Sequence, residues 1–164
     1  MSNLAIVGTG YVADLYMRSL KTFPNINVVK AFDTGTDRLD AFCRFWDVPQ
    51  ASSLDDVLDG SSETVDLVLN LTNPASHHAV SKRCLEAGMP VYSEKPLATS
   101  MSEAIDLHAL AKAKGLIIAS APCSVLGKAA QTAWRALRDG KIGKPLLVYA
   151  ELDDDFVPQA PYRK

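Results

Sequence analysis

Residues 4–13 read LAIVGTGYVA, a short apolar run that ends in a glycine-rich turn. The apolar residues predict a buried strand, and residues 11–22 have the pattern of a helix. A strand that leads through such a turn into a helix is typical of the first unit of a dinucleotide-binding fold. Gly8 permits the tight turn, Gly10 lets a pyrophosphate approach the backbone, and Ala13 lets the helix pack closely on the strand.

This turn is the predicted phosphate site. The first N–H groups of a helix have no partner within the helix, and the helix dipole places partial positive charge there. We therefore expect contacts between the turn and the pyrophosphate of a dinucleotide. The residues concerned are Gly8, Thr9, Gly10, Tyr11 and Val12. The alternative interpretation is a structural glycine turn that binds no ligand.

Beyond this turn, short apolar runs alternate with helical patterns. Ser53 and Ser100 each stand three residues before an acidic residue, which is typical of a residue that caps a helix N-terminus. Apolar runs without polar alternation indicate strands that are buried on both faces. The predicted fold class is therefore α/β, a doubly wound, mostly parallel sheet with helices on both faces, of the Rossmann type. Strands are predicted at residues 4–7, 27–32, 65–70, 91–93, 116–119 and 145–152, and helices at 11–22, 37–46, 53–60, 74–87, 100–115 and 127–139.

A single domain over residues 1–152 accounts for this pattern, and a chain of 164 residues is long enough to bury one core. The composition changes at residues 153–155, which are three aspartates, and two prolines follow. We interpret residues 153–164 as the start of a linker or of a truncated second domain.

Polar residues that follow the predicted strands form the candidate site. Asp33 ends the second strand, where an acid bonds the adenosine ribose hydroxyls and repels a 2′-phosphate. This favours NAD over NADP, although the nearby Arg38 weakens the preference. The alternative is that Asp33 only caps the turn that follows it. Thr72 and Asn73 follow the third strand, where they are placed to bond the cofactor's ribose.

Glu94, Lys95 and Pro96 follow the fourth predicted strand. A lysine in a partly desolvated site can hold a substrate hydroxyl or carbonyl group, so Lys95 is the candidate catalytic residue. Glu94 is expected to pair with that lysine or to bond the nicotinamide ribose, and Pro96 restricts the backbone and can adopt the cis form. Taken alone, the tripeptide is more often a solvated Glu–Lys pair. His77 is a further candidate for the cofactor site, although histidines in such positions are more often surface residues.

Composition excludes several classes of protein. The net charge is −2 and no basic stripe exists, so we expect no nucleic-acid or membrane partner. The three cysteines are far apart in the sequence, so we expect neither a disulfide framework nor a metal site, and a cytoplasmic location. No apolar run approaches the roughly 18 residues of a membrane span, and the N-terminus shows no secretory signal.

With these motifs in order, the chain resembles the Gfo/Idh/MocA family of NAD(P)-dependent oxidoreductases from Gly8 to about Leu152. The resemblance implies an N-terminal Rossmann domain, a catalytic or substrate-orienting Lys95 and a Lys95-Pro96 bond that can be cis. It also implies that Glu94 lies near the nicotinamide. The most specific motifs are Gly8-x-Gly10-x-x-Ala13, Thr72-Asn73-Pro74-x-x-His77 and Glu94-Lys95-Pro96-Leu97-Ala98.

The function implied by the resemblance is hydride transfer between NAD, with NADP as the alternative, and a hydroxyl or carbonyl carbon of a sugar, cyclitol or similar polyol. Members carry a second domain that supplies most of the substrate pocket. This chain lacks it, so we expect no activity from the chain alone, and self-association as a homo-oligomer through the face that such a domain covers.

One departure concerns an arginine that many members carry after the last core strand. Residues 121–126 read APCSVL instead, so no substrate contact from that arginine is assigned. Two rival hypotheses remain open at this point. One is a non-catalytic dinucleotide-binding module that serves as a sensor or interaction protein. The other is a methyltransferase on a similar fold, in which the Glu-Lys-Pro motif has no role.

Overall fold

The computed structural model describes residues 1–59, 64–121 and 123–151. The chain divides into two compact units, Met1–Ala121 and Pro122–Lys164, and each is described separately. In order along the chain, the first unit contains β1 (Ser2–Val7), α1 (Tyr11–Leu20), β2 (Ile26–Phe32), α2 (Thr36–Trp46), α3 (Leu54–Leu58), β3 (Leu67–Asn70), the 3-10 helix η1 (Pro74–Ser76), α4 (His77–Glu86), β4 (Val91–Ser93), α5 (Met101–Lys114) and β5 (Ile118–Ser120).

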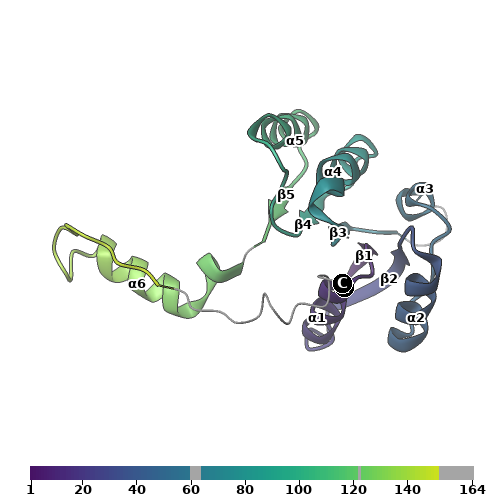
Figure 1. Ribbon diagram of the computed structural model, residues 1–164, viewed down its shortest axis with the longest axis horizontal. Coiled ribbons are helices and arrows are strands. Elements are labelled where there is room, and N and C mark those ends of the chain that lie inside the picture. The colour runs from purple at the N-terminus through teal and green to yellow at the C-terminus, as the bar shows by residue number, and fades with distance from the viewer. Residues whose placement is uncertain (60–63, 122, 152–164) are drawn as a thin grey trace. The chain divides into compact units, whose positions relative to one another are not determined.

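The strands of the first unit form one parallel sheet in the order β2-β1-β3-β4-β5. β1 therefore lies inside the sheet, and the chain leaves it on one side to form β2 and returns on the other side to form β3 (Figure 1). This reversal is the topological switch point, and ligands of open parallel sheets bind outside the carboxyl ends of the strands at such a point.

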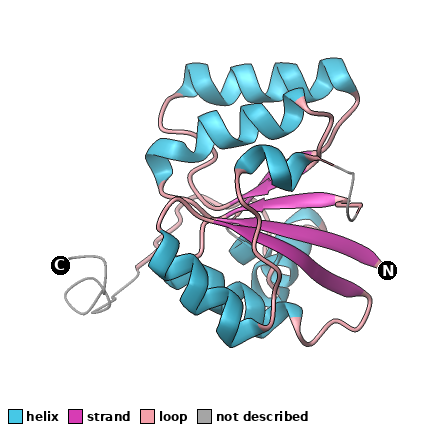
Figure 2. Ribbon diagram, turned by 90° about the vertical axis from the view of Figure 1, so that its right-hand side faces the viewer, coloured by secondary structure: helices cyan, strands magenta, loops and turns pink. Residues whose placement is uncertain are grey.

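Helices cover both faces of the sheet (Figure 2). Alternate residues of β1 enter two different cores, because successive side chains of a strand point to opposite faces. Leu4 and Ile6 pack with residues of α1 and α2, whereas Ala5 and Val7 pack with residues of α3, α4 and α5. The predicted doubly wound α/β fold is therefore confirmed.

Two of the predicted helix starts are confirmed in detail. The Ser53 hydroxyl accepts the N–H of Asp56 at the start of α3. Ser100 and Glu103 form a reciprocal capping box at the start of α5. These caps satisfy backbone N–H groups that have no partner within the helix.

The described part of the second unit contains the 3-10 helix η2 (Cys123–Leu126) and α6 (Lys128–Arg138). The strand predicted at residues 145–152 was wrong for residues 145–151, which form no strand. Leu146 and Tyr149, within that run, are 92% and 83% exposed. A strand needs a neighbour to accept its backbone hydrogen bonds, and the described residues of the second unit supply none. Residues 152–164, including the predicted linker, lie outside the described residues, so the domain end at 152 stays a prediction.

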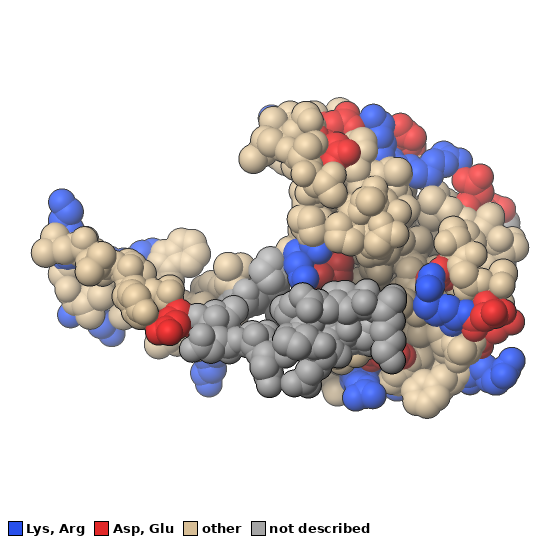
Figure 3. All heavy atoms as spheres, in the orientation of Figure 1, with Lys and Arg blue, Asp and Glu red and all other residues tan. Residues whose placement is uncertain are grey.

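Charged side chains of both signs lie close together over the face of the first unit seen in Figure 3. Among the residues that the structure describes, no helix is long and apolar enough to cross a membrane.

Candidate functional site

The glycine turn occupies the carboxyl end of β1 and the N-terminus of α1. Gly8 has a φ of +97°, and a Cβ at this position would lie 2.6 Å from the carbonyl carbon and oxygen of Leu71. The turn after β1 and the segment after β3 are thus in backbone contact, and only glycine permits this. Above Gly10 the space is open, since a Cβ there would meet no atom within 4 Å.

Gly10 is also the N-cap residue of α1, and no side chain caps this helix. The first turn of α1 therefore presents backbone N–H groups beside open space at a switch point of the sheet, which is an arrangement suited to an anion. Thr9 is buried, Val12 is half-buried, and Tyr11 is 46% exposed. The contacts predicted for these residues with a pyrophosphate stay predictions.

Asp33, directly after β2, lies against the same turn. Its carboxylate accepts hydrogen bonds from the Thr9 backbone N–H at 2.7 Å and the Thr9 hydroxyl at 3.1 Å. It also accepts the Gly35 backbone N–H at 2.8 Å and two bonds from the Arg38 guanidinium, at 3.1 and 2.5 Å. Burial alone would raise the pKa of Asp33, but the bonds from Arg38, Thr9 and Gly35 outweigh it and lower the pKa to about 2.

The Asp33 carboxylate is therefore ionised, and its place at the end of β2 is the one predicted for an adenosine ribose contact. Its oxygens are already in use by the protein. The side chain of Arg38 is 55% exposed, whereas that of Asp33 is 6% exposed. Of the two side chains, Arg38 is thus the one that can move. A ribose hydroxyl that donates to Asp33 would replace one of the two hydrogen bonds from Arg38.

Arg38, the partner of Asp33, lines a groove that has a volume of about 380 Å³. It lies between α1 and α2, and it contains a second cation that sequence reasoning missed, Arg18. Arg18 sits within a helical pattern with no motif around it, so nothing in the sequence placed it near Arg38. The groove is lined by Thr9, Asp14, Arg18, Arg38, Ala41, Phe42, Phe45 and Trp46.

The segment after β3 is organised by a buried amide that the sequence analysis did not single out. Asn70 is fully buried, and its Oδ1 accepts the Thr72 hydroxyl at 2.7 Å. Its Nδ2 donates to the carbonyl of His77 at 3.1 Å and to the hydroxyl of Ser81 at 3.0 Å. The only signal in the sequence was a polar residue at the end of an apolar run. Asn73 uses its side-chain oxygen to accept the N–H of Ser76, which caps η1. Ribose contacts from Thr72 and Asn73 stay predictions.

His77 is 1% exposed, so it is a core residue and not a surface residue. Its Nδ1 lies 2.5 Å from the carbonyl oxygen of Pro96, and its Nε2 lies 2.9 Å from the carbonyl oxygen of Thr72. The ring thus joins the segment after β3 to the segment after β4. A direct contact between His77 and a cofactor stays a prediction. In this structure the ring acts on the site through the two segments that it joins.

The Glu94-Lys95-Pro96 turn follows β4. The Lys95-Pro96 peptide bond is cis, as the resemblance implied. The Glu94 backbone N–H donates to the carbonyl of Asn70 at 2.8 Å, which places this turn beside the segment after β3. Lys95 is exposed, and the ion pairs among the described residues do not include it. Of the two roles expected for Glu94, an ion pair with Lys95 is not found among the described residues, and a contact with the nicotinamide ribose stays a prediction.

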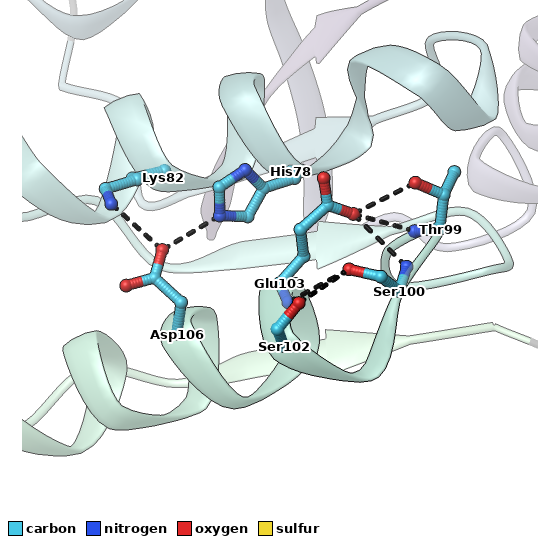
Figure 4. A network of polar contacts seen from close by, with 7 residues as sticks. All are labelled: His78, Lys82, Thr99, Ser100, Ser102, Glu103 and Asp106. Carbon is cyan, nitrogen blue, oxygen red and sulfur yellow. Dashed lines mark hydrogen bonds and ion pairs between the residues drawn. The ribbon is translucent and has the colours of Figure 1, made fainter.

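The segment that follows Pro96 is held at its other end by the start of α5. The Glu103 carboxylate accepts the backbone N–H groups of Thr99 and Ser100 (Figure 4). One turn further along α5, Asp106 accepts hydrogen bonds from His78 and Lys82 of α4. These contacts join α5 to α4, so the Lys95 turn lies between two anchored elements.

A parallel, doubly wound sheet with an uncapped helix N-terminus at its switch point and an acid at the end of β2 defines a Rossmann dinucleotide-binding domain. A family model described as an oxidoreductase family with an NAD-binding Rossmann fold, Gfo/Idh/MocA, matches residues 2–121. The chain belongs to this family.

Several relatives and solved structures match the chain. The uncharacterized oxidoreductase YhhX of Escherichia coli K12 is 37% identical over 102 residues, which cover 62% of this chain and 29% of the relative. Inositol 2-dehydrogenase 1 of Saccharopolyspora erythraea is 34% identical over 110 residues, which cover 60% of this chain and 31% of the relative. Biliverdin reductase from Synechocystis sp. PCC 6803, solved with biliverdin and NADP+, matches with a TM-score of 0.72 and 28% identity, covering 87% of this chain and 44% of that chain.

The WlbA dehydrogenase of Bordetella pertussis, solved with NADH and UDP-GlcNAcA, has a TM-score of 0.81 over 87% of this chain and 41% of its own. At 21% identity, this likeness shows the fold alone. The chain thus spans less than half the length of each of these four proteins.

Proposed function

We propose that this chain is the cofactor-binding part of an NAD(P)-dependent dehydrogenase that acts on a sugar, cyclitol or similar polyol. The observation that supports this most directly is the position of Lys95. Its exposed side chain follows β4, at the same edge of the sheet as the glycine turn after β1 and Asp33 after β2. An amine at that edge lies on the path of an extended dinucleotide, at the end away from the adenosine.

The residues present fit such a cofactor. Gly8 to Val12, at the start of α1, would hold the pyrophosphate, and Asp33 would accept a hydrogen bond from the adenosine ribose. Thr72, Asn73 and the segment joined by His77 would hold the middle of the cofactor. Glu94 and Pro96 would contact its nicotinamide end. NAD is the expected cofactor because of Asp33. NADP is the alternative because Arg38 and Arg18 both line the neighbouring groove.

The bound nicotinamide would supply the acceptor or donor of the hydride. Lys95 would donate a hydrogen bond to the hydroxyl or carbonyl oxygen of the substrate, and in its neutral amine form it would take up the hydroxyl proton. The rest of the substrate pocket lies outside this chain, which spans only part of its relatives, so turnover requires a further domain.

The proposed class of substrate, a polyol, is supported by two relatives whose names include a substrate. One is the inositol 2-dehydrogenase 1 described above. A second is D-apiose dehydrogenase of Paraburkholderia graminis, which is 25% identical over 141 residues, or 86% of this chain and 37% of that protein. Both names describe dehydrogenases of polyhydroxylated small molecules, which is the class that we propose.

The test is a calorimetric titration of the chain with NADH, NADPH and ADP. NADH binding that is weakened at least about tenfold in Gly10→Val, which fills the open space above the turn, supports the proposal. Asp33→Ala is the second variant, and it should weaken NADH more than NADPH because it removes a charge that repels a 2′-phosphate. Wild-type protein that binds none of the three ligands contradicts the proposal.

A further inference from the structure

Both oxygens of the Glu94 carboxylate have a hydrogen-bond donor. Tyr16 of α1, 78 positions earlier in the chain, donates its hydroxyl to Oε1 at 3.1 Å. The backbone N–H of Lys95 donates to Oε2 at 2.9 Å. The ammonium group of Lys95 is neither of these partners. The carboxylate is therefore held by a tyrosine and a backbone amide, although a lysine side chain is its immediate neighbour in the sequence.

Tyr16 is itself held in place. Its ring meets the ring of Tyr92 edge-on, with centroids 6.4 Å apart and an interplanar angle of 62°. Tyr92 belongs to β4, two positions before Glu94, and both rings pack against the core on the α1 side of the sheet. Burial and the Glu94 charge raise the pKa of the Tyr16 hydroxyl well above its usual value, so the group remains a protonated donor.

We propose that Tyr16 is a positioning residue, whose hydroxyl holds the Glu94 carboxylate apart from the Lys95 ammonium. Lys95 then stays available to the substrate, and Glu94 keeps a fixed orientation toward the nicotinamide end of the cofactor. This inference rests on the proposed function, because it assigns a role within the same site. α1 thereby serves both ends of the cofactor, since its N-terminus faces the pyrophosphate and its second turn orients Glu94.

The Tyr16 hydroxyl and the Lys95 ammonium compete for one carboxylate. If the Tyr16 hydroxyl is removed, Oε1 loses its donor, and the ammonium of the next residue is the nearest mobile cation in the sequence. The Lys95 side chain is exposed and Glu94 is half-buried, and their opposite charges attract, so the carboxylate turns toward Lys95. That movement misplaces Glu94 and occupies Lys95, while the glycine turn and Asp33 are untouched.

The test is Tyr16→Phe, which removes one oxygen and keeps the ring against Tyr92. The measurement is the dissociation constant of NADH and that of ADP, which contains the adenosine and pyrophosphate but no nicotinamide. We expect NADH to bind roughly fivefold more weakly, as for the loss of one ordinary hydrogen bond, and ADP to bind within about twofold of wild type. If both ligands weaken together, Tyr16 only supports the packing of α1, and the inference is overturned. Unchanged NADH binding overturns it as well.

The chain offers a matched control. Tyr149 donates its hydroxyl to Glu151 at the same distance, 3.1 Å, but it is 83% exposed and lies in the second unit. Tyr149→Phe should therefore leave the binding of both ligands unchanged. A second control is Tyr16→Phe in a Glu94→Ala background, where the hydroxyl no longer has a carboxylate to hold. An equal loss of NADH affinity in that background contradicts a role through Glu94.

The outcomes separate this inference from the proposed function. A wild-type chain that binds neither NADH nor ADP contradicts the proposed function and the role of Tyr16 with it. A wild-type chain that binds both, with a Tyr16→Phe variant that behaves like it, overturns only the role of Tyr16.

Discussion

The ends of β2 and β4 hold their carboxylates in opposite ways. Asp33, after β2, accepts five hydrogen bonds, and its side chain is 6% exposed. Glu94, after β4, is half-buried and accepts one bond from Tyr16 and one from Lys95, next to an exposed lysine side chain. The Asp33 carboxylate is thus held by many donors, whereas the Glu94 carboxylate has two and stands next to an exposed side chain.

This difference is consistent with the proposal that one end of the site binds the adenosine and pyrophosphate and the other end carries the reaction. Binding of the adenosine and pyrophosphate requires a rigid site, because preorganised groups lose little freedom when the ligand binds. The reactive end must also accept a substrate, and in our proposal a further domain completes it. Four substitutions test whether the site is rigid near Asp33 and accessible near Lys95. They follow in order from the largest expected effect to the smallest.

Gly8→Ala should have the largest effect on stability. The new Cβ would lie 2.6 Å from backbone atoms of Leu71 at a φ of +97°, so either the turn or the segment after β3 must move. We expect a loss of about 4 kcal/mol in the free energy of unfolding, measured by urea titration. Gly88→Ala is the matched control, because Gly88 has a φ of +84° but open space around it. It should cost about 1 kcal/mol, from the backbone conformation alone. Equal losses for the two variants would contradict the backbone contact.

His77→Ala should have the next largest effect. The substitution removes a ring that is 1% exposed, together with its contacts to the carbonyl oxygens of Thr72 and Pro96. We expect a loss of about 3 kcal/mol in the free energy of unfolding. His78→Ala, one position along α4, removes a half-exposed ring bonded to Asp106 and should cost less than about 1 kcal/mol. A His77→Ala variant as stable as wild type would show that the two segments are not joined through this ring.

Asp33→Asn tests the rigid end through pH. The pKa of Asp33 is about 2 in the folded chain and 3.8 when unperturbed, so its ionised form stabilises the fold above that ordinary value. The stabilisation, about 2 kcal/mol, is lost as the pH falls from about 4 to about 2. In urea titrations between pH 7 and pH 2, the variant should be less stable than wild type at neutral pH, and the gap should narrow in acid. A gap that does not vary with pH would mean that the Arg38, Thr9 and Gly35 bonds do not depend on the charge.

Lys95→Ala should have the smallest effect on the chain itself. The side chain is exposed and has no ion pair among the described residues, so the free energy of unfolding should change by less than about 0.5 kcal/mol. ADP affinity should stay within about twofold of wild type. Once a complete enzyme with a substrate domain is assayed, the same change should lower kcat by at least about a hundredfold. A large loss of stability would show that the Lys95 side chain stabilises the fold and is not free for a substrate.

Much of this arrangement could be predicted from local sequence. The glycine turn, the strands before Asp33, Thr72 and Glu94, and the caps at Ser53 and Ser100 depend on residues a few positions apart. The prediction failed at residues 145–151, where a run of apolar residues was interpreted as a strand. β-branched and aromatic residues favour strands, but a strand exists only beside another strand, and that neighbour is not a local property.

By itself, the sequence determined the alternation of strands and helices, the glycine that the turn after β1 requires, and which residues stand at strand ends. These follow from backbone sterics, capping and the period of apolar residues, all of which act over a few positions. Only the tertiary structure decided that His77 is buried between two carbonyl groups, that Arg18 joins Arg38 in one groove, and that Tyr16 and not Lys95 holds Glu94. The contacts of His77 with Pro96 and of Tyr16 with Glu94 join residues that are 19 and 78 positions apart. They form because the order β2-β1-β3-β4-β5 brings the ends of neighbouring strands and the start of α1 together.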